Sequence, residues 1–93
     1  MGEFVMPDNI GPLAGAEVDD YENAVHLYRT LISLIDWHID RATDPARTAE
    51  LNAAADRYAE EKRELRITDR EAVARALRDL PALIDEFEIG VTD

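Results

Sequence analysis

The sequence predicts an all-α protein, in which a helical hairpin is completed to a three- or four-helix bundle that forms a dimer. Three observations carry this prediction. Apolar residues recur at steps of three and four between residues 19 and 42, as on one face of a helix. Asp44-Pro45 pairs an N-cap residue with a proline suited to the first helical position. Thr68 and Glu71 have the spacing of a capping box.

The first predicted helix, residues 19–42, organises the domain. Its apolar stripe comprises Tyr21, Ala24, Val25, Tyr28, Leu31, Ile32, Ile35, Ile39 and Ala42. Within this stripe, the candidate core or dimer face consists of Tyr21, Tyr28, Leu31, Ile35 and Ile39. Leu27 and Leu34 widen the apolar surface beyond what a short, alanine-rich second helix would cover. We therefore expect this helix to form a homodimer interface.

Three more helices are expected, over residues 45–66, 69–79 and 81–88. Pro81 suits the first turn of the last one or a bend in the helix before it, and Gly90 is expected to end it. Residues 1–17, rich in proline and glycine, are predicted to be an irregular arm, and residues 18–93 a single helical domain. Met1–Phe4 precede a second methionine, and we treat them as a cloning remnant.

The composition excludes several classes of function. The 93 residues include 21 Asp and Glu against 10 Lys and Arg, a formal charge of −11, which disfavours binding to nucleic-acid phosphates or an anionic membrane. The chain has no cysteine, so it can form neither a disulfide nor a Cys-based zinc site. We find no membrane-spanning stretch and no secretory signal, and expect a cytoplasmic protein.

The acidity itself has three explanations that composition does not rank. It can reflect a salt-adapted proteome, in which net charge maintains solubility. It can match a basic protein partner, or it can mimic a nucleic acid.

One group of carboxylates is a candidate for enzyme chemistry. Glu60, Glu61 and Glu64 form a Glu-Glu-x-x-Glu run. The run resembles the paired carboxylates of all-helical nucleoside triphosphate pyrophosphohydrolases of the MazG type, a resemblance that implies magnesium around a triphosphate. That family also has a downstream Glu-x-x-Asp, where this chain has only Asp85-Glu86-Phe87-Glu88. Neighbouring arginines and a lysine favour an ion-paired helix surface instead. We therefore predict no catalytic residue, no metal ligand and no cofactor.

Two other features are candidates for partner binding. Trp37 falls off the apolar stripe, so it either packs beneath another segment or anchors a partner. Near the C-terminus, acidic and apolar residues alternate, which suits docking on a basic, partly apolar surface or closing the core. The predicted partner-binding residues are Trp37, Asp85, Glu86, Phe87 and Glu88.

The leading functional hypothesis is a small acidic, non-enzymatic module that binds, and neutralises or regulates, a basic protein, as antitoxins, immunity proteins and inhibitors do. The first alternative is a structural or homo-oligomeric assembly subunit whose acidity reflects a salt-adapted host. A lesser alternative is a metal-dependent, all-α nucleotide pyrophosphohydrolase.

Overall fold

The computed structural model describes residues 15–92, and the side chains of residues 15–89. It confirms the all-α prediction. Over this part of the chain there are three helices, α1 (Gly15–Arg41), α2 (Pro45–Glu64) and α3 (Arg70–Thr92), and no strand. None of the helices is both long and apolar enough to cross a membrane.

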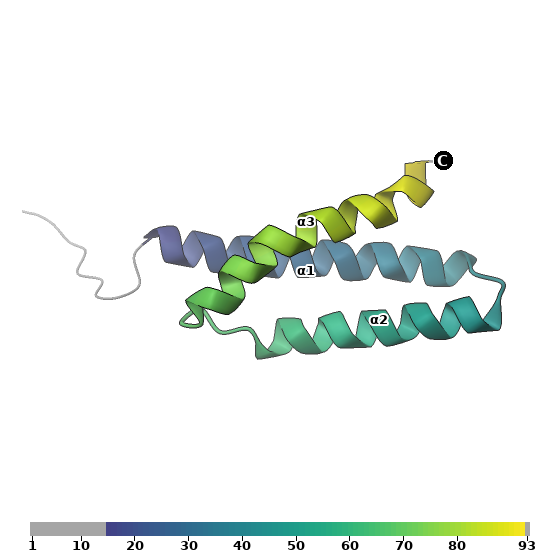
Figure 1. The fold of residues 1–93 in the computed structure, drawn as a ribbon, viewed down its shortest axis with the longest axis horizontal. Coiled ribbons are helices and arrows are strands. Elements are labelled where there is room, and N and C mark those ends of the chain that lie inside the picture. Colours follow the sequence, from purple (N-terminus) through teal and green to yellow (C-terminus); the bar gives the residue numbers. More distant parts are fainter. Residues whose placement is uncertain (1–14, 93) are drawn as a thin grey trace, which may run out of the picture.

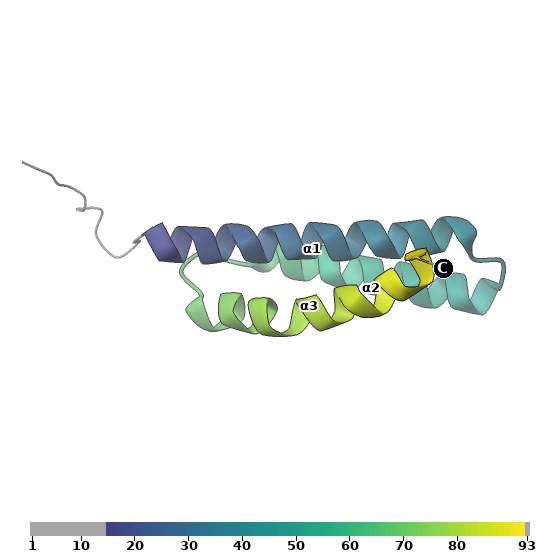
Figure 2. The ribbon, with the colours of Figure 1, turned by 90° about the horizontal axis from the view of Figure 1, so that it is seen from above.

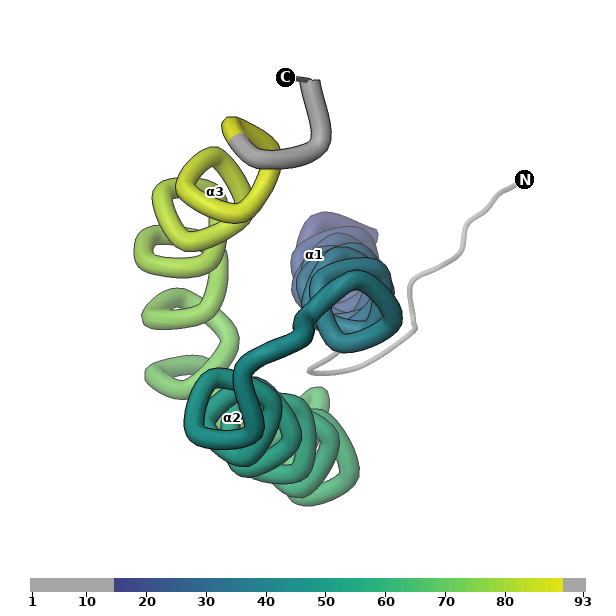
Figure 3. Tube along the Cα trace, turned by 90° about the vertical axis from the view of Figure 1, so that its right-hand side faces the viewer, coloured from purple at the N-terminus to yellow at the C-terminus, as the bar shows by residue number. Residues whose placement is uncertain are grey.

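The first helix is the centre of the fold. α1 packs against both α2 and α3, and the two lie on the same side of it (Figures 1 and 3). In contrast, no Cα atom of α2 lies within 8 Å of a Cα atom of α3 in the described chain. The two outer helices, α2 and α3, therefore both pack on α1 but do not pack on each other.

A single cluster of apolar side chains holds the three helices together. Leu31 and Ile35 of α1 are fully buried at its centre. The other buried members are Ala24, Tyr28, Leu51, Tyr58, Leu65, Val73, Ala76, Leu80 and Ile84. Each fully buried aliphatic side chain contributes about 1.5–3 kcal/mol relative to an exposed one, so this cluster supplies most of the favourable free energy of folding.

The hairpin between α1 and α2 forms as its sequence predicts. Asp44 is the N-cap of α2, and its Oδ1 accepts a hydrogen bond from the Ala46 amide at 3.2 Å. Pro45 occupies the first turn, where a missing N–H costs nothing. α2 ends at Glu64, where the extended backbone of Leu65 turns the chain towards α3.

The predicted division into a third helix, residues 69–79, and a fourth, residues 81–88, is wrong, whereas the alternative role of Pro81, a bend within one helix, is the one that the structure shows (Figure 2). α3 runs without interruption from Arg70 to Thr92, with Pro81 inside it, and it continues past Gly90. Proline removes one amide donor and clashes with the preceding turn, which bends a helix without necessarily ending it. α3 is bent about its middle (Figure 2). Tertiary packing on α1 through Leu80 and Ile84, on either side of the proline, keeps the two halves in one helix.

Two local predictions also need correction. The N-cap of α3 is Asp69 and not Thr68, because Asp69 Oδ1 accepts a hydrogen bond from the Ala72 amide at 3.1 Å. Residues 15–17 of the predicted irregular arm belong to α1, where Glu17 forms an ion pair with Arg70 at the start of α3. This contact between distant residues supports the extra helical turn. The remainder of the predicted arm, residues 1–14, lies outside the described residues.

Candidate functional site

A groove of about 470 Å³ lies between α2 and α3, with α1 beneath it. Its floor is apolar, formed by Tyr28, Tyr58, Leu65, Ala72, Ala76, Leu80 and Leu83. Its rim is charged, formed by Arg57, Glu61, Glu64, Asp69, Arg75 and Asp79. The groove exists because α1 separates the outer helices, so the apolar sides of α2 and α3 remain partly uncovered.

Tyr28 connects α1, which lies beneath the groove, to α2, which forms one of its walls. Its hydroxyl donates a hydrogen bond to Glu61 Oε1 at 3.1 Å, which joins α1 to α2. Burial of the phenol, together with the charge of Glu61 and its hydrogen bond, raises the pKa of Tyr28 to about 12. Tyr28 therefore stays protonated and remains a hydrogen-bond donor throughout the physiological range.

Arg57 and Tyr58 form a second fixed element on the wall from α2. Arg57 Nη2 donates a hydrogen bond to the Tyr58 hydroxyl at 2.7 Å. Its guanidinium carbon also lies 4.7 Å from the centroid of the Tyr58 ring. These contacts hold a cation beside the apolar floor, where it can meet a carboxylate or a carbonyl of a bound segment.

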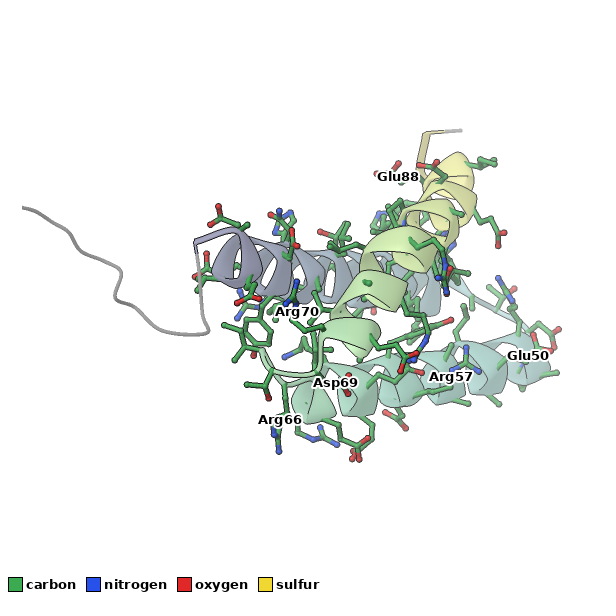
Figure 4. The ribbon with its side chains drawn as sticks, turned by 60° about the vertical axis from the view of Figure 1, so that its left-hand side comes forward. Glu50, Arg57, Arg66, Asp69, Arg70 and Glu88 are labelled. Carbon is green, nitrogen blue, oxygen red and sulfur yellow. The ribbon has the colours of Figure 1, made fainter. Side chains whose placement is uncertain are left out.

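The rim as a whole is acidic, with four carboxylates against two guanidinium groups. Asp69 serves as the N-cap of α3, and the Arg78 hydrogen bond holds the pKa of the Asp79 carboxyl below its ordinary value. The Asp79 carboxyl therefore remains ionised at neutral pH. Figure 4 shows Asp69, one of the groove-lining carboxylates, where the chain enters α3, and Glu88 towards the far end of the helix.

The structure divides the predicted acidic segment among different sides of α3. Asp85, Glu86 and Glu88 are exposed. Glu86 follows Asp79 by seven residues, about two helical turns, so it continues the groove side of the helix. Asp85 and Glu88 fall on other sides, away from the groove.

Phe87 points inward and is half-buried against the core. Its carbonyl lies 2.8 Å from His38 Nε2 of α1, and because a carbonyl oxygen only accepts, the imidazole donates this hydrogen bond. The two rings are tilted, with centroids 5.5 Å apart. Phe87 thus attaches the end of α3 to α1.

Trp37 lies apart from the groove. It is half-buried on the side of α1 that faces away from α2 and α3, in a shallow depression shared with His26, Arg29, Thr30, Ser33 and Leu34. The Arg41 guanidinium carbon sits 3.8 Å from its ring centroid, a cation–π contact. The structure therefore does not bring Trp37 and Glu86 to a single site.

The predicted core or dimer face points into the molecule. Tyr28, Leu31 and Ile35 are buried, and Tyr21 and Ile39 pack partly buried against them. In this chain these side chains contact α2 and α3.

No protein-family model matches this chain, and neither a curated protein nor a solved structure shows significant similarity to it. The groove and its side chains are therefore the basis for a functional argument.

Glu60 and Glu61, two of the glutamates that resembled a magnesium site, lie on different sides of α2. Glu60 pairs with Arg63 on the outer side of α2, whereas Glu61 accepts the hydrogen bond of Tyr28 inside the groove. Among the described residues, no three His, Asp or Glu side chains are grouped so that they could hold a metal ion.

Sequence reasoning missed Arg75 and Asp79, which line the groove from α3. A signal for them is present in the spacing, because Arg75, Asp79 and Glu86 lie four and seven residues apart and share one side of a helix. This spacing was missed because the sequence analysis placed residues 69–79 and 81–88 in separate helices, which separated Glu86 from Arg75 and Asp79.

Proposed function

We propose that this protein is a non-enzymatic interaction module whose groove between α2 and α3 receives a basic, amphipathic helix of a partner protein, which is thereby neutralised or regulated. One observation carries the proposal. The apolar floor between two helices that do not close over it is surrounded by a rim with an excess of carboxylates. This arrangement matches recognition of a helix in a groove.

The shape of the groove favours a helix as the occupant. Its walls are two helices, so an added helix would complete a four-helix arrangement with α1 opposite to it. Ala72 and Ala76, one helical turn apart on α3, are both groove-lining residues, and small side chains allow a close approach of backbones. Leu80 and Leu83 extend the apolar floor beyond them, so an apolar stripe on the ligand would be buried along α3.

The charge favours a basic occupant. The rim carries four carboxylates, Glu86 extends it, and the whole chain has a formal charge of −11. Such a potential accelerates encounter with a cationic ligand at low ionic strength and repels acidic ones. Arg57 and Arg75 add specificity, because they favour ligands with an acceptor at matching positions.

The absence of cysteine allows a direct test. Glu64→Cys places a single thiol on the rim, where it can carry an environment-sensitive fluorophore, and Asp56→Cys places one on an exposed position of α2 outside the groove. The probes are two synthetic helices with the same leucine stripe, flanked by lysine in one and by glutamate in the other. We expect the lysine peptide to change the fluorescence of the label at residue 64 but not that of the label at residue 56. The glutamate peptide should change the fluorescence of neither label.

Charge reversal on the rim then separates partner binding from salt adaptation. Glu64→Arg with Asp79→Arg should weaken binding of the lysine peptide at least about tenfold, because two attractive pairs become repulsive. Asp56→Arg with Glu71→Arg makes the same change in net charge outside the groove and should have a much smaller effect. Equal effects of both pairs, or no saturable binding, would contradict the proposal and favour acidity that serves solubility alone.

A further inference from the structure

The charged side chains that line the groove are ordered along its length. The connection at residues 65–69 joins the end of α2 to the start of α3, so both walls can be followed from it. Glu64, the last residue of α2, and Asp69, the N-cap of α3, lie beside this connection, one on each wall. Arg66, within the connection, points away from Asp69 and donates its hydrogen bonds to backbone carbonyls (Figure 4). The groove lining is therefore acidic at this end.

Both groove-lining guanidinium groups lie further along the walls. Arg57 precedes Glu64 by seven residues, about 10 Å along α2. Arg75 follows Asp69 by six residues, about 9 Å along α3. The two guanidinium groups therefore lie at similar distances from the connection, on opposite walls. Arg57 uses one donor on the Tyr58 hydroxyl, and Arg75 has no hydrogen-bond partner among the described residues. Both keep donors available to a ligand.

Tyr28, on the floor, lies between these two walls. Its pKa is raised mainly by burial and by Glu61, is lowered in part by the charge of Arg75, and is raised in part by Tyr58, the partner of Arg57. The phenol is thus within electrostatic reach of both walls. Glu61 accepts the Tyr28 hydrogen bond and precedes Glu64 by three residues, so its charge belongs to the acidic end.

Beyond the guanidinium groups, the groove becomes acidic again. Asp79 lies one helical turn after Arg75 on the same wall, and Glu86 follows it by seven residues on an exposed position. Arg78 donates two hydrogen bonds to the Asp79 carboxylate, at 2.9 and 3.4 Å, and offsets part of its charge. Among the described residues, the lining therefore changes from acidic to basic and back to acidic along its length.

We propose that the partner helix carries the complementary order of charge, with basic residues in its end turns and acidic residues on both sides of its apolar stripe in the middle. This inference rests on the proposed function and specifies the ligand of the same groove. Each central carboxylate meets one guanidinium group, Arg57 on one wall or Arg75 on the other, in a charge-assisted hydrogen bond. The order is symmetric, so it applies to either direction of the bound helix.

Two synthetic helices of identical composition test the order of charge without changing net charge. Both have the same leucine stripe and equal numbers of lysines and glutamates. The centre-acidic peptide has its glutamates in the middle turn and its lysines in the end turns, and the centre-basic peptide has these positions exchanged. We expect calorimetric titration of the full chain to show about fivefold tighter binding of the centre-acidic peptide, the size of effect expected from a few partly exposed ion pairs.

Charge reversal at the two arginines makes the test specific. Arg57→Glu with Arg75→Glu should reverse the preference, so that the centre-basic peptide binds more tightly. A reversal cannot arise from a difference between the free peptides or from loss of the fold. Arg29→Glu with Arg47→Glu makes the same change in net charge at exposed positions outside the groove. This control should bind both peptides at least as tightly as the unaltered chain does and should retain the preference for the centre-acidic peptide.

The outcomes separate this inference from the proposal on which it rests. If neither peptide binds, the groove does not receive a basic helix, and the proposed function fails with the inference. If both peptides bind equally, or the unaltered chain prefers the centre-basic peptide, the order of charge is wrong but binding in the groove stands. Reversal of the preference by the control pair would also overturn the inference, because net charge and not Arg57 and Arg75 would then determine it.

Discussion

The hydroxyl of Tyr28 and the carboxylate of Glu61, 33 residues apart in the sequence, form a hydrogen bond of 3.1 Å that joins α1 to α2 beneath the groove. Burial of Tyr28 and the negative charge of Glu61 both favour the protonated phenol, and they raise its pKa from an ordinary value of 10 to about 12. This one contact links the core, the groove and the pH dependence of stability.

The first prediction concerns stability at high pH. Because the pKa is higher in the folded state, the unfolded chain loses this proton first, so the contribution is complete below pH 10 and is lost as the pH rises towards 12. We expect the free energy of unfolding to fall by about 2 kcal/mol over this interval from Tyr28 alone. Urea denaturation at a series of pH values measures it. Tyr28→Phe should flatten the slope, and Tyr21→Phe, in the same helix, should retain it.

The second prediction distinguishes the two candidate caps of α3. Asp69→Ala removes the acceptor of the Ala72 amide and should reduce stability by about 1 kcal/mol. Thr68→Ala, one residue earlier, should cost much less, because Thr68 precedes the N-cap. The midpoints of thermal unfolding compare the two variants. A larger loss from Thr68→Ala would restore the capping box that the sequence suggested.

The third prediction concerns the attachment of the C-terminal part of α3. His38→Ala removes the hydrogen bond to the Phe87 carbonyl and the ring contact with Phe87, and it should cost about 1 kcal/mol. Hydrogen exchange should show faster opening of amides after Pro81 than of amides before it. His26→Ala, at an exposed position of the same helix, is the matched control. Uniform acceleration along α3 would indicate that His38 does not act locally.

The fourth prediction separates the two sides of α1. Leu31→Ala empties a fully buried position and should reduce stability by about 2–5 kcal/mol. Leu34→Ala, three residues later on the partly exposed side, should cost less than Leu31→Ala. Urea denaturation of the two variants measures both losses of stability. Comparable losses of monomer stability would place Leu34 in the core.

The sequence alone was sufficient for the class of fold and for most of the core. The spacing of Tyr28, Leu31 and Ile35 identifies the buried side of α1, because a helix that packs on one side repeats its apolar residues every three or four positions. Asp44-Pro45 likewise located the start of α2, since an N-cap followed by proline acts through local backbone geometry.

Tertiary structure decided what local signals could not. Pro81 would end or bend an isolated helix, but packing of Leu80 and Ile84 on α1 keeps α3 continuous, because buried apolar area outweighs one missing hydrogen bond. The groove also depends on how α2 and α3 are spaced around α1. Arg57 and Asp79 come together there from helices whose separation no local pattern encodes. The sequence by itself thus determined the helices and their buried sides, and only the packing of α1 against both neighbours decided which surfaces remain open for binding.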